Sequence, residues 1–349
     1  MGLFLAGTPL ERRWNAAGYE DWGKALDELK ERGYDTVRID AYPHLLAADP
    51  IGQWTLKPEW NQQTWGAPGI IRLCNLQGNL IEFLALCRQR GILVGLSSWY
   101  REDLDNTRMK LAVPEDLARI WVRVLDVVAE AGLMGTVLYV DLCNEYPRDS
   151  WAKFLRNDPA APRTDKEFSR SSEVAVRWMN RAIDLVRAKY PDMDYTFSQD
   201  GEYDSTESQD VSRLDFLEPH LWMTSCTDFC RRIDFRYDRF APDSFQRLAL
   251  HGKETYEEQP EVWDDCLRKG VANLAQWSRR TGKPLITTEC WSLVDFKDGP
   301  MLEWDWIKHL CEVGVTRRCP KAAGRPLPPA TSAARSLLGC GGISPGTSA

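Results

Sequence analysis

The sequence predicts an α/β fold of the (β/α)8 TIM-barrel class. Helix-like and strand-like segments alternate along the chain, which is typical of parallel strands joined by crossover helices. Two of the strand-like segments end in a glutamate, Glu145 and Glu289, and parallel barrels carry their functional side chains at the carboxyl ends of the strands. A doubly wound open sheet is the alternative, but no glycine-rich phosphate-binding turn follows any of these strands. We therefore expect a barrel whose eighth strand is poorly represented in this chain.

The first half of the chain contains four predicted strands and three predicted helices. The strand-like runs are residues 3–6, 36–40, 92–97 and 136–145, and the helical ones are 19–32, 79–90 and 114–131. Apolar residues recur at helical spacing in the helical runs. Gly33, Gly91 and Gly132 follow them, and glycine commonly ends a helix. The fourth strand then ends in Glu145.

The second half repeats the alternation three more times. The predicted strands are 195–198, 216–223 and 284–289, and the predicted helices are 168–190, 257–280 and 301–313. On this count Glu145 ends the fourth strand and Glu289 ends the seventh. The connections 42–79 and 222–255 are long and rich in aromatic and charged residues, so we expect them to shape a substrate site.

The composition changes after residue 315, so we divide the chain into a barrel domain, 1–315, and an atypical tail, 316–349. The tail is rich in Pro, Ala, Gly and Arg and lacks an apolar period, which is typical of a disordered segment. An out-of-frame translation is the second interpretation. Residues 328–336 (PPATSAARS) are what ATSNFCGPQ becomes when its codons are read one base late, and residues 340–348 (CGGISPGTS) correspond to MWRDIPWHQ in that frame.

Composition and motifs exclude several classes of function. The net charge of -7 argues against a nucleic-acid partner. No apolar run reaches the ~18 residues of a membrane helix, and we recognise no signal peptide, so a cytoplasmic protein is expected. The ten cysteines lack the paired spacing of a zinc site. Neither a zinc-protease helix nor a phosphate-binding loop occurs. We expect no metal and no cofactor, and the oligomeric state stays open.

Two carboxylates at strand ends point to the hydrolysis of a glycosidic bond, which needs a proton donor and a second carboxylate. Each glutamate could instead cap a helix or form a structural ion pair. The chain also contains 15 tryptophans. Tryptophan rings stack on sugars, although packing in the core is the alternative for each of them.

The sequence around the two glutamates resembles a known family. Residues 141–147 (DLCNEYP) resemble the strand-four Asn-Glu motif of clan A glycoside hydrolases, and residues 288–291 (TECW) resemble their strand-seven nucleophile motif. Over about residues 10–315 the chain is similar to the sugar-binding, cellulase-like family related to family 5 glycosidases.

The resemblance implies a retaining β-glycoside hydrolase acting on a small oligosaccharide or β-glycoside without a cofactor. Glu145 would be the acid/base, with a raised pKa, and Glu289 the ionised nucleophile. Arg38 would point at the nucleophile, although it could instead pair with Asp40 or Glu31 at the surface. Asn144 would hydrogen-bond the sugar 2-hydroxyl, or else cap the following turn.

Five more residues are candidates for contact with the sugar: His220, Trp222, Trp99, Asp40 and Trp291. His220 would hold the nucleophile or a hydroxyl, Trp222 would offer a stacking face, and both could simply belong to the core. Asp40 would line the non-reducing-end subsite, whereas Trp291 could either stack or pack.

The chain departs from the family pattern at two places. Family 5 enzymes often have a histidine after strand three, where this chain has Ser98 and Trp99. They also carry a strand-eight tryptophan, whereas residues 316–349 contain no Trp, Tyr or Phe. These departures keep a second function open, a non-catalytic carbohydrate-binding protein on the same fold.

Overall fold

The computed structural model describes residues 3–7, 9–10, 19–58, 71–223, 226–236, 242–292, 303 and 305–316. The predicted tail lies outside these residues apart from its first member, so the domain boundary and the reading frame stay predictions.

Parallel strands follow one another in chain order. One sheet has the order β1-β2-β5-β6-β7 and another the order β10-β9-β8, and all of their pairings are parallel. The strands are β1 (Leu3–Gly7), β2 (Thr36–Asp40), β5 (Leu93–Ser97), β6 (Val137–Asp141), β7 (Asp194–Thr196), β8 (Gln199–Asp200), β9 (Pro219–Trp222) and β10 (Cys290–Trp291). Because β8 continues the chain directly after β7, the described residues form seven successive strand positions. The predicted α/β fold with parallel strands is confirmed.

The strands curl around a shared interior. In a flat sheet β2 and β10 would lie five strand spacings apart, or about 24 Å. Nevertheless, Arg38 on β2 donates a hydrogen bond of 2.9 Å to Glu289, the residue before β10. The seven positions therefore bend until the second and the seventh face each other.

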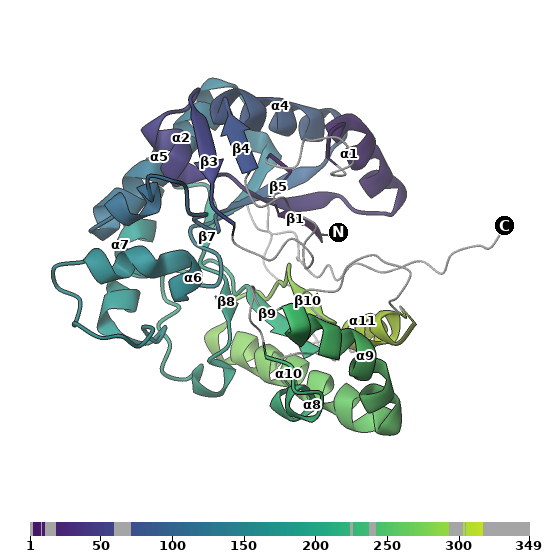
Figure 1. Ribbon diagram of the computed structural model, residues 1–349. Helices are drawn as coiled ribbons and strands as arrows, with labels where there is room; N and C mark the ends of the chain where they lie inside the picture. The colour runs from purple at the N-terminus through teal and green to yellow at the C-terminus, as the bar shows by residue number, and fades with distance from the viewer. Residues whose placement is uncertain are drawn as a thin grey trace.

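Helices cover the outside of the curled strands. In Figure 1, α1, α4 and α5 lie beside β1 to β5, and α8 to α11 gather beside β8 to β10. The main helices are α1 (Trp22–Glu31), α4 (Leu76–Gln89), α5 (Pro114–Glu130), α7 (Glu173–Lys189), α8 (Thr227–Arg232), α9 (Pro242–Glu258), α10 (Pro260–Thr281) and α11 (Asp305–Thr316). Five helical tryptophans pack inward and are at most 2% exposed: Trp22, Trp121, Trp178, Trp263 and Trp277. No helix in the part of the chain that the structure describes is long and apolar enough to cross a membrane.

Large side chains fill the interior below the strand ends. Tyr139 of β6 packs edge-on against Phe216 with ring centroids 5.0 Å apart, and Ile286 joins them. A Cβ atom on Gly95 would lie 2.3 Å from the Tyr139 ring. Glycine is therefore required at this point of β5, because any other residue would displace the tyrosine.

Several predicted boundaries are wrong. The fourth strand ends at Asp141, not at Glu145, because Glu145 has a φ of 45°, which no strand can contain. The predicted strand 284–289 keeps only an isolated parallel bridge between Leu217 and Leu285, and the regular pairing comes afterwards in β10. There the chain turns on itself, since the Thr287 hydroxyl bonds the Glu289 carbonyl at 3.2 Å.

The long connections contain more regular structure than the sequence predicted. The first holds α2 (Pro43–Ala48) and an antiparallel hairpin of β3 (Gln53–Leu56) and β4 (Ile71–Cys74). The second holds α8 and most of α9. The predicted helix 257–280 is divided between α9 and α10, because Pro260 lacks an N–H group and begins a new helix. A short helix, α6 (Asp149–Ala152), follows the turn of Glu145.

Candidate active site

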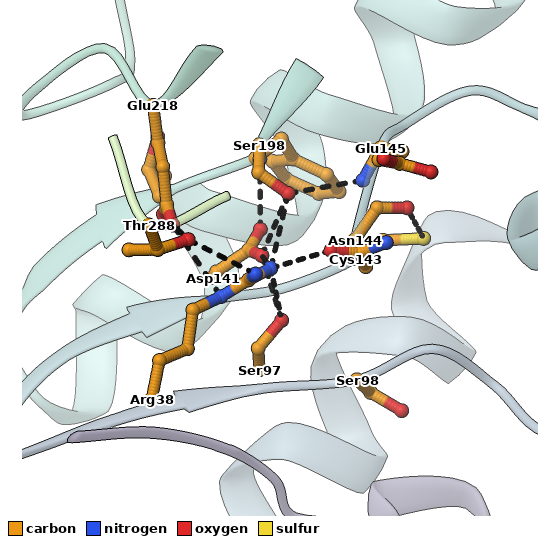
Figure 2. Close-up of polar contacts among 12 residues, drawn as sticks. Arg38, Ser97, Ser98, Asp141, Cys143, Asn144, Glu145, Ser198, Glu218 and Thr288 are labelled. Atoms are coloured by element: carbon orange, nitrogen blue, oxygen red, sulfur yellow. Dashed lines mark hydrogen bonds and ion pairs between the residues drawn. The ribbon is translucent and has the colours of Figure 1, made fainter. Parts of the chain in front are cut away.

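Arg38 is the centre of a buried polar network at the carboxyl ends of the strands (Figure 2). Its side chain is fully buried. Its Nη1 atom donates to Glu289 Oε1 at 2.9 Å and to Thr288 Oγ1 at 3.1 Å. Its Nη2 atom donates to Asp141 Oδ2 at 2.5 Å and to Asn144 Oδ1 at 2.6 Å. The predicted approach of Arg38 to Glu289 is therefore present, and a surface pairing with Asp40 or Glu31 is not.

His220 connects the two glutamates. Its Nδ1 atom lies 3.0 Å from Glu145 Oε1 and 3.6 Å from Glu289 Oε2. One ligand atom from each of the three residues lies within 4.8 Å of the others. The side chains of Glu145 and Glu289 remain 17% and 8% exposed, whereas His220 is fully buried. The carboxylates therefore reach the surface of the site while the imidazole supports them from below.

Glu145 is held in a strained turn. Its left-handed backbone, with φ 45°, costs about 1–3 kcal/mol for a non-glycine residue. Two hydrogen bonds offset this cost. The Glu145 amide donates to Ser198 Oγ at 2.9 Å, and the Trp151 indole donates to Glu145 Oε2 at 2.9 Å. The turn directs the carboxylate toward His220 instead of along the strand.

Asn144 precedes this turn and is fully buried. Its backbone N–H donates to the Ser98 carbonyl at 2.9 Å, and its Oδ1 accepts from Arg38. These bonds fix the amide so that Nδ2 is the free end, and this atom has no hydrogen-bond partner among the described residues. Asn144 shares Arg38 with Glu289. A sugar hydroxyl could accept from its unused Nδ2 donor, and this sugar contact stays a prediction.

Electrostatics assign the proton of this site to the histidine. Burial lowers the pKa of His220, but Glu289 and the hydrogen bond to Glu145 outweigh burial and raise it to about 9. Burial works to raise the pKa of Glu145, yet His220 and Trp151 lower it below its ordinary value. Burial raises the pKa of Glu289 against the pull of His220 and Arg38. The direction for Glu145 is therefore the opposite of the predicted one, because the imidazolium and the Trp151 indole lie against its carboxylate. For Glu289 burial is the largest cause of the raised pKa.

The same three residues could in principle ligate a metal ion. Arg38 and the protonated His220 already compensate the two carboxylates. A divalent metal ion would be repelled by the imidazolium, which has no lone pair free to bind it. The donor set therefore fits proton transfer better than metal binding.

Trp99 and Asp40, two of the other predicted sugar contacts, are buried near Arg38 but make different contacts. Trp99 is nearly buried, and its ring lies over the Arg38 guanidinium at 4.7 Å. Asp40 is fully buried and accepts backbone N–H groups from Tyr42 at 2.8 Å and from Trp99 at 3.1 Å. Asp40 thus shapes the turns after β2 and β5, and a contact of either residue with sugar stays a prediction.

Trp222 and Trp291 are register partners at the ends of β9 and β10. Trp222 is half-buried. Trp291 is 8% exposed and packs on α11, where a Cβ atom on Gly314 would lie 2.3 Å from the indole. Of the two roles predicted for Trp291, packing is the one that these contacts support, whereas stacking on sugar stays a prediction for Trp222.

Several residues of the network were not predicted. They are Ser97, Asp141, Trp151, Ser198, Glu218 and Thr288. Asp141 lies inside the quoted Asn-Glu motif, and Glu218 lies two positions before His220, so proximity to the motifs was an available signal. Trp151 gave no such signal, because its bond to Glu145 depends on the turn between them.

Comparisons with known proteins show the family of the chain and its fold. The model of the sugar-binding cellulase-like family matches residues 6–336. A crystal structure from Parabacteroides distasonis, provisionally named a glycoside hydrolase, has a TM-score of 0.85 and 44% identity, covering 90% of this chain and 82% of that one. A comparison with curated proteins gave no match.

A variant of a family 5 (subfamily 18) protein from Streptomyces cattleya, bound to Manβ1-4GlcNAc, has a TM-score of 0.50 and 14% identity, covering 90% of this chain and 67% of that one. This likeness concerns the fold alone, and the relation to family 5 is therefore structural. Together with the match over residues 6–336, these findings show that the chain belongs to the sugar-binding cellulase-like family and has the fold of glycoside hydrolases.

Proposed function

We propose that the protein is a retaining β-glycoside hydrolase on a (β/α)8 barrel, with Glu145 as acid/base and Glu289 as nucleophile. The spacing of the two carboxylates carries the proposal, since one oxygen of each lies within 4.8 Å of the other. Retaining enzymes need carboxyl groups about 5–5.5 Å apart, whereas inverting enzymes need about 6.5–9.5 Å to admit a water molecule. The curl of seven parallel strands supports the barrel.

The first step requires a proton on Glu145 and a negative charge on Glu289. Moving the proton from His220 Nδ1 to Glu145 Oε1, along their 3.0 Å contact, produces that state without exchange with solvent. A sugar ring over the site would remove water from Glu145 and so favour its neutral form. Glu145 then protonates the leaving oxygen while Glu289 attacks the anomeric carbon and the glycosidic bond breaks.

The second step releases the sugar. Glu145, now ionised, takes a proton from a water molecule, whose oxygen attacks the anomeric carbon and breaks the ester bond to Glu289. The Nδ2 group of Asn144 would donate to the sugar 2-hydroxyl, and Arg38 keeps Glu289 a good leaving group by stabilising its charge.

Hydrolysis of a panel of aryl β-glycosides tests this proposal. The panel contains the glucoside, galactoside, mannoside, xyloside and fucoside, and the mannoside is motivated by the disaccharide in the Streptomyces cattleya structure. We expect phenol release from at least one substrate, and we expect Glu289→Gln to abolish it while melting cooperatively by circular dichroism. Unchanged turnover in Glu289→Gln would refute the assignment.

A non-catalytic carbohydrate-binding protein is the second candidate. The lowered pKa of Glu145 favours this candidate. If the proton stays on His220, Glu145 is ionised and cannot act as the general acid. Calorimetric binding of a sugar without hydrolysis of any substrate in the panel, by a protein that melts cooperatively, would favour this candidate.

A further inference from the structure

Glu218 is a buried carboxylate that the two-glutamate mechanism does not use. It immediately precedes β9, and its side chain is fully buried. Burying a carboxylate costs several kcal/mol unless close partners compensate it. A residue kept at such a cost beneath an active site calls for a role there.

Two contacts define the position of Glu218 (Figure 2). Its Oε1 atom accepts a hydrogen bond of 2.6 Å from the Thr288 hydroxyl. The same atom lies 3.4 Å from Arg38 Nε. Its second oxygen, Oε2, has no hydrogen-bond partner among the described residues. Glu218 therefore contacts Arg38 and Thr288, both of which adjoin the nucleophile.

The guanidinium of Arg38 is a rigid planar fork, so fixing two of its edges fixes the third. Asp141 holds the Nη2 end at 2.5 Å, and Glu218 faces the Nε edge at 3.4 Å. The remaining edge, Nη1, points at Glu289 Oε1 at 2.9 Å. The Glu218 contact is an ion pair without a hydrogen bond from Nε, and Asn144, Ser97 and Ser198 also hold Nη2. The two buried carboxylates thus contribute to where the arginine points.

The Thr288 hydroxyl adds a directional link. A hydroxyl has one proton to donate, and here the proton goes to Glu218. The lone pairs of the oxygen are then left for Arg38 Nη1, which donates to it at 3.1 Å.

We propose that Glu218 is a positioning residue for the nucleophile, which orders Arg38 and Thr288 so that Arg38 Nη1 is directed at Glu289. This inference rests on the proposed function.

Charge adds a second consequence. The charged and titratable groups that act on Glu218 are Arg38 from β2, Tyr139 and Asp141 from β6 and His220 from β9 itself. Burial raises the pKa of Glu218 to about 7, against the pull of Arg38. When Glu218 ionises, its charge attracts Arg38 and helps to keep His220 protonated.

The test compares Glu218→Gln, Thr288→Val and the matched control Asp158→Asn. Asp158 is also buried and pairs with an arginine, Arg177, but outside the site. We expect both site variants to lower kcat on the order of ten- to hundredfold with little change in KM, because a misdirected group near the chemistry is costly. In Glu218→Gln the acid limb of kcat should also move to higher pH, because an Arg38 that no longer points at Glu289 stabilises the charge of the nucleophile less. Asp158→Asn should change neither.

A second readout does not depend on activity. The chain has only four histidines, so the His220 imidazole can be titrated by NMR. Its pKa, about 9, should fall in Glu218→Gln, because a nearby negative charge is removed, and should stay in Asp158→Asn. If the wild type hydrolyses nothing, the proposed function fails while this titration still decides the role of Glu218. An unmoved His220 in a folded Glu218→Gln, or wild-type kcat in Thr288→Val, would overturn the inference.

Discussion

His220 holds the proton that the acid/base needs, and this location has a consequence for stability. Its pKa is raised from an ordinary value of 6.5 to about 9. The stabilisation is therefore fully present below about pH 6.5 and is lost as the pH rises through about 9.

We expect His220→Gln to flatten the fall in unfolding free energy between these two pH values. The lost contribution is on the order of 3 kcal/mol. Chemical denaturation across this range measures it, with His309→Gln on α11 as the control, because His309 is half-exposed and pairs with Asp264 instead of a residue of the site. A slope that is the same in wild type and His220→Gln would contradict the assignment of the proton.

Trp151 tunes the other side of the acid/base. Its indole donates to Glu145 Oε2 at 2.9 Å and so stabilises the ionised form. Trp151→Phe should raise the pKa of Glu145 and move the alkaline limb of kcat/KM to higher pH.

A stability loss of about 1 kcal/mol should accompany this shift, since a single buried hydrogen bond is removed. Trp178→Phe is the matched control, because Trp178 makes a similar indole bond of 2.6 Å to the carboxylate of Asp158. Equal shifts of the pH profile in both variants would show that the effect is general and not local to Glu145.

At the scale of elements, β5 and β6 depend on one glycine. A Cβ atom on Gly95 would lie 2.3 Å from Tyr139, whereas one on Gly135 would meet no atom within 4 Å. Gly95→Ala should therefore destabilise the fold by about 1–3 kcal/mol through overpacking, and Gly135→Ala should be nearly neutral. Thermal melts of both variants test this, and similar melting temperatures would contradict the packing described here.

The sequence predicted elements whose signals are local. Apolar runs revealed β2 and β5, and helical spacing with a terminal glycine revealed α1 and α5. The boundary of β6 was missed because the left-handed backbone of Glu145 depends on two hydrogen bonds. One is made with Ser198, which is distant in the sequence, and the other with Trp151, which lies beyond the turn. The β3–β4 hairpin and α9 were missed because aromatic and charged residues in them were interpreted as loop.

The candidate site was predicted to a similar extent. Glu145 and Glu289 were predicted from strand-like runs and motif spacing, Arg38 was predicted from the family resemblance, and the structure brings the three together. The directions of the pKa shifts could not be predicted, because they depend on whether the His220 imidazole lies nearer to Glu145 or to Glu289, a difference of 3.0 against 3.6 Å. Glu218 lies two positions before His220, but its contact with Arg38 joins residues far apart in the chain and could not be read from that proximity.

At the scale of the whole molecule, the tail is the open prediction. The family match extends to residue 336, whereas we place the domain boundary at 315. Sequencing the genomic locus and the transcript would decide between a native tail and an out-of-frame one. The frameshift hypothesis expects one inserted or deleted base before residue 328. It would be rejected if the genomic locus and the transcript both encode the tail without such a change.

The central claim is that Glu289 attacks the sugar. A 2-deoxy-2-fluoro-β-glycoside of the best substrate should trap the intermediate, and mass spectrometry of the digested protein should find one glycosyl ester on the peptide that contains Glu289. Glu289→Gln should carry no such adduct. Turnover of the parent glycoside with inverted stereochemistry, or an adduct on another carboxylate, would contradict the account.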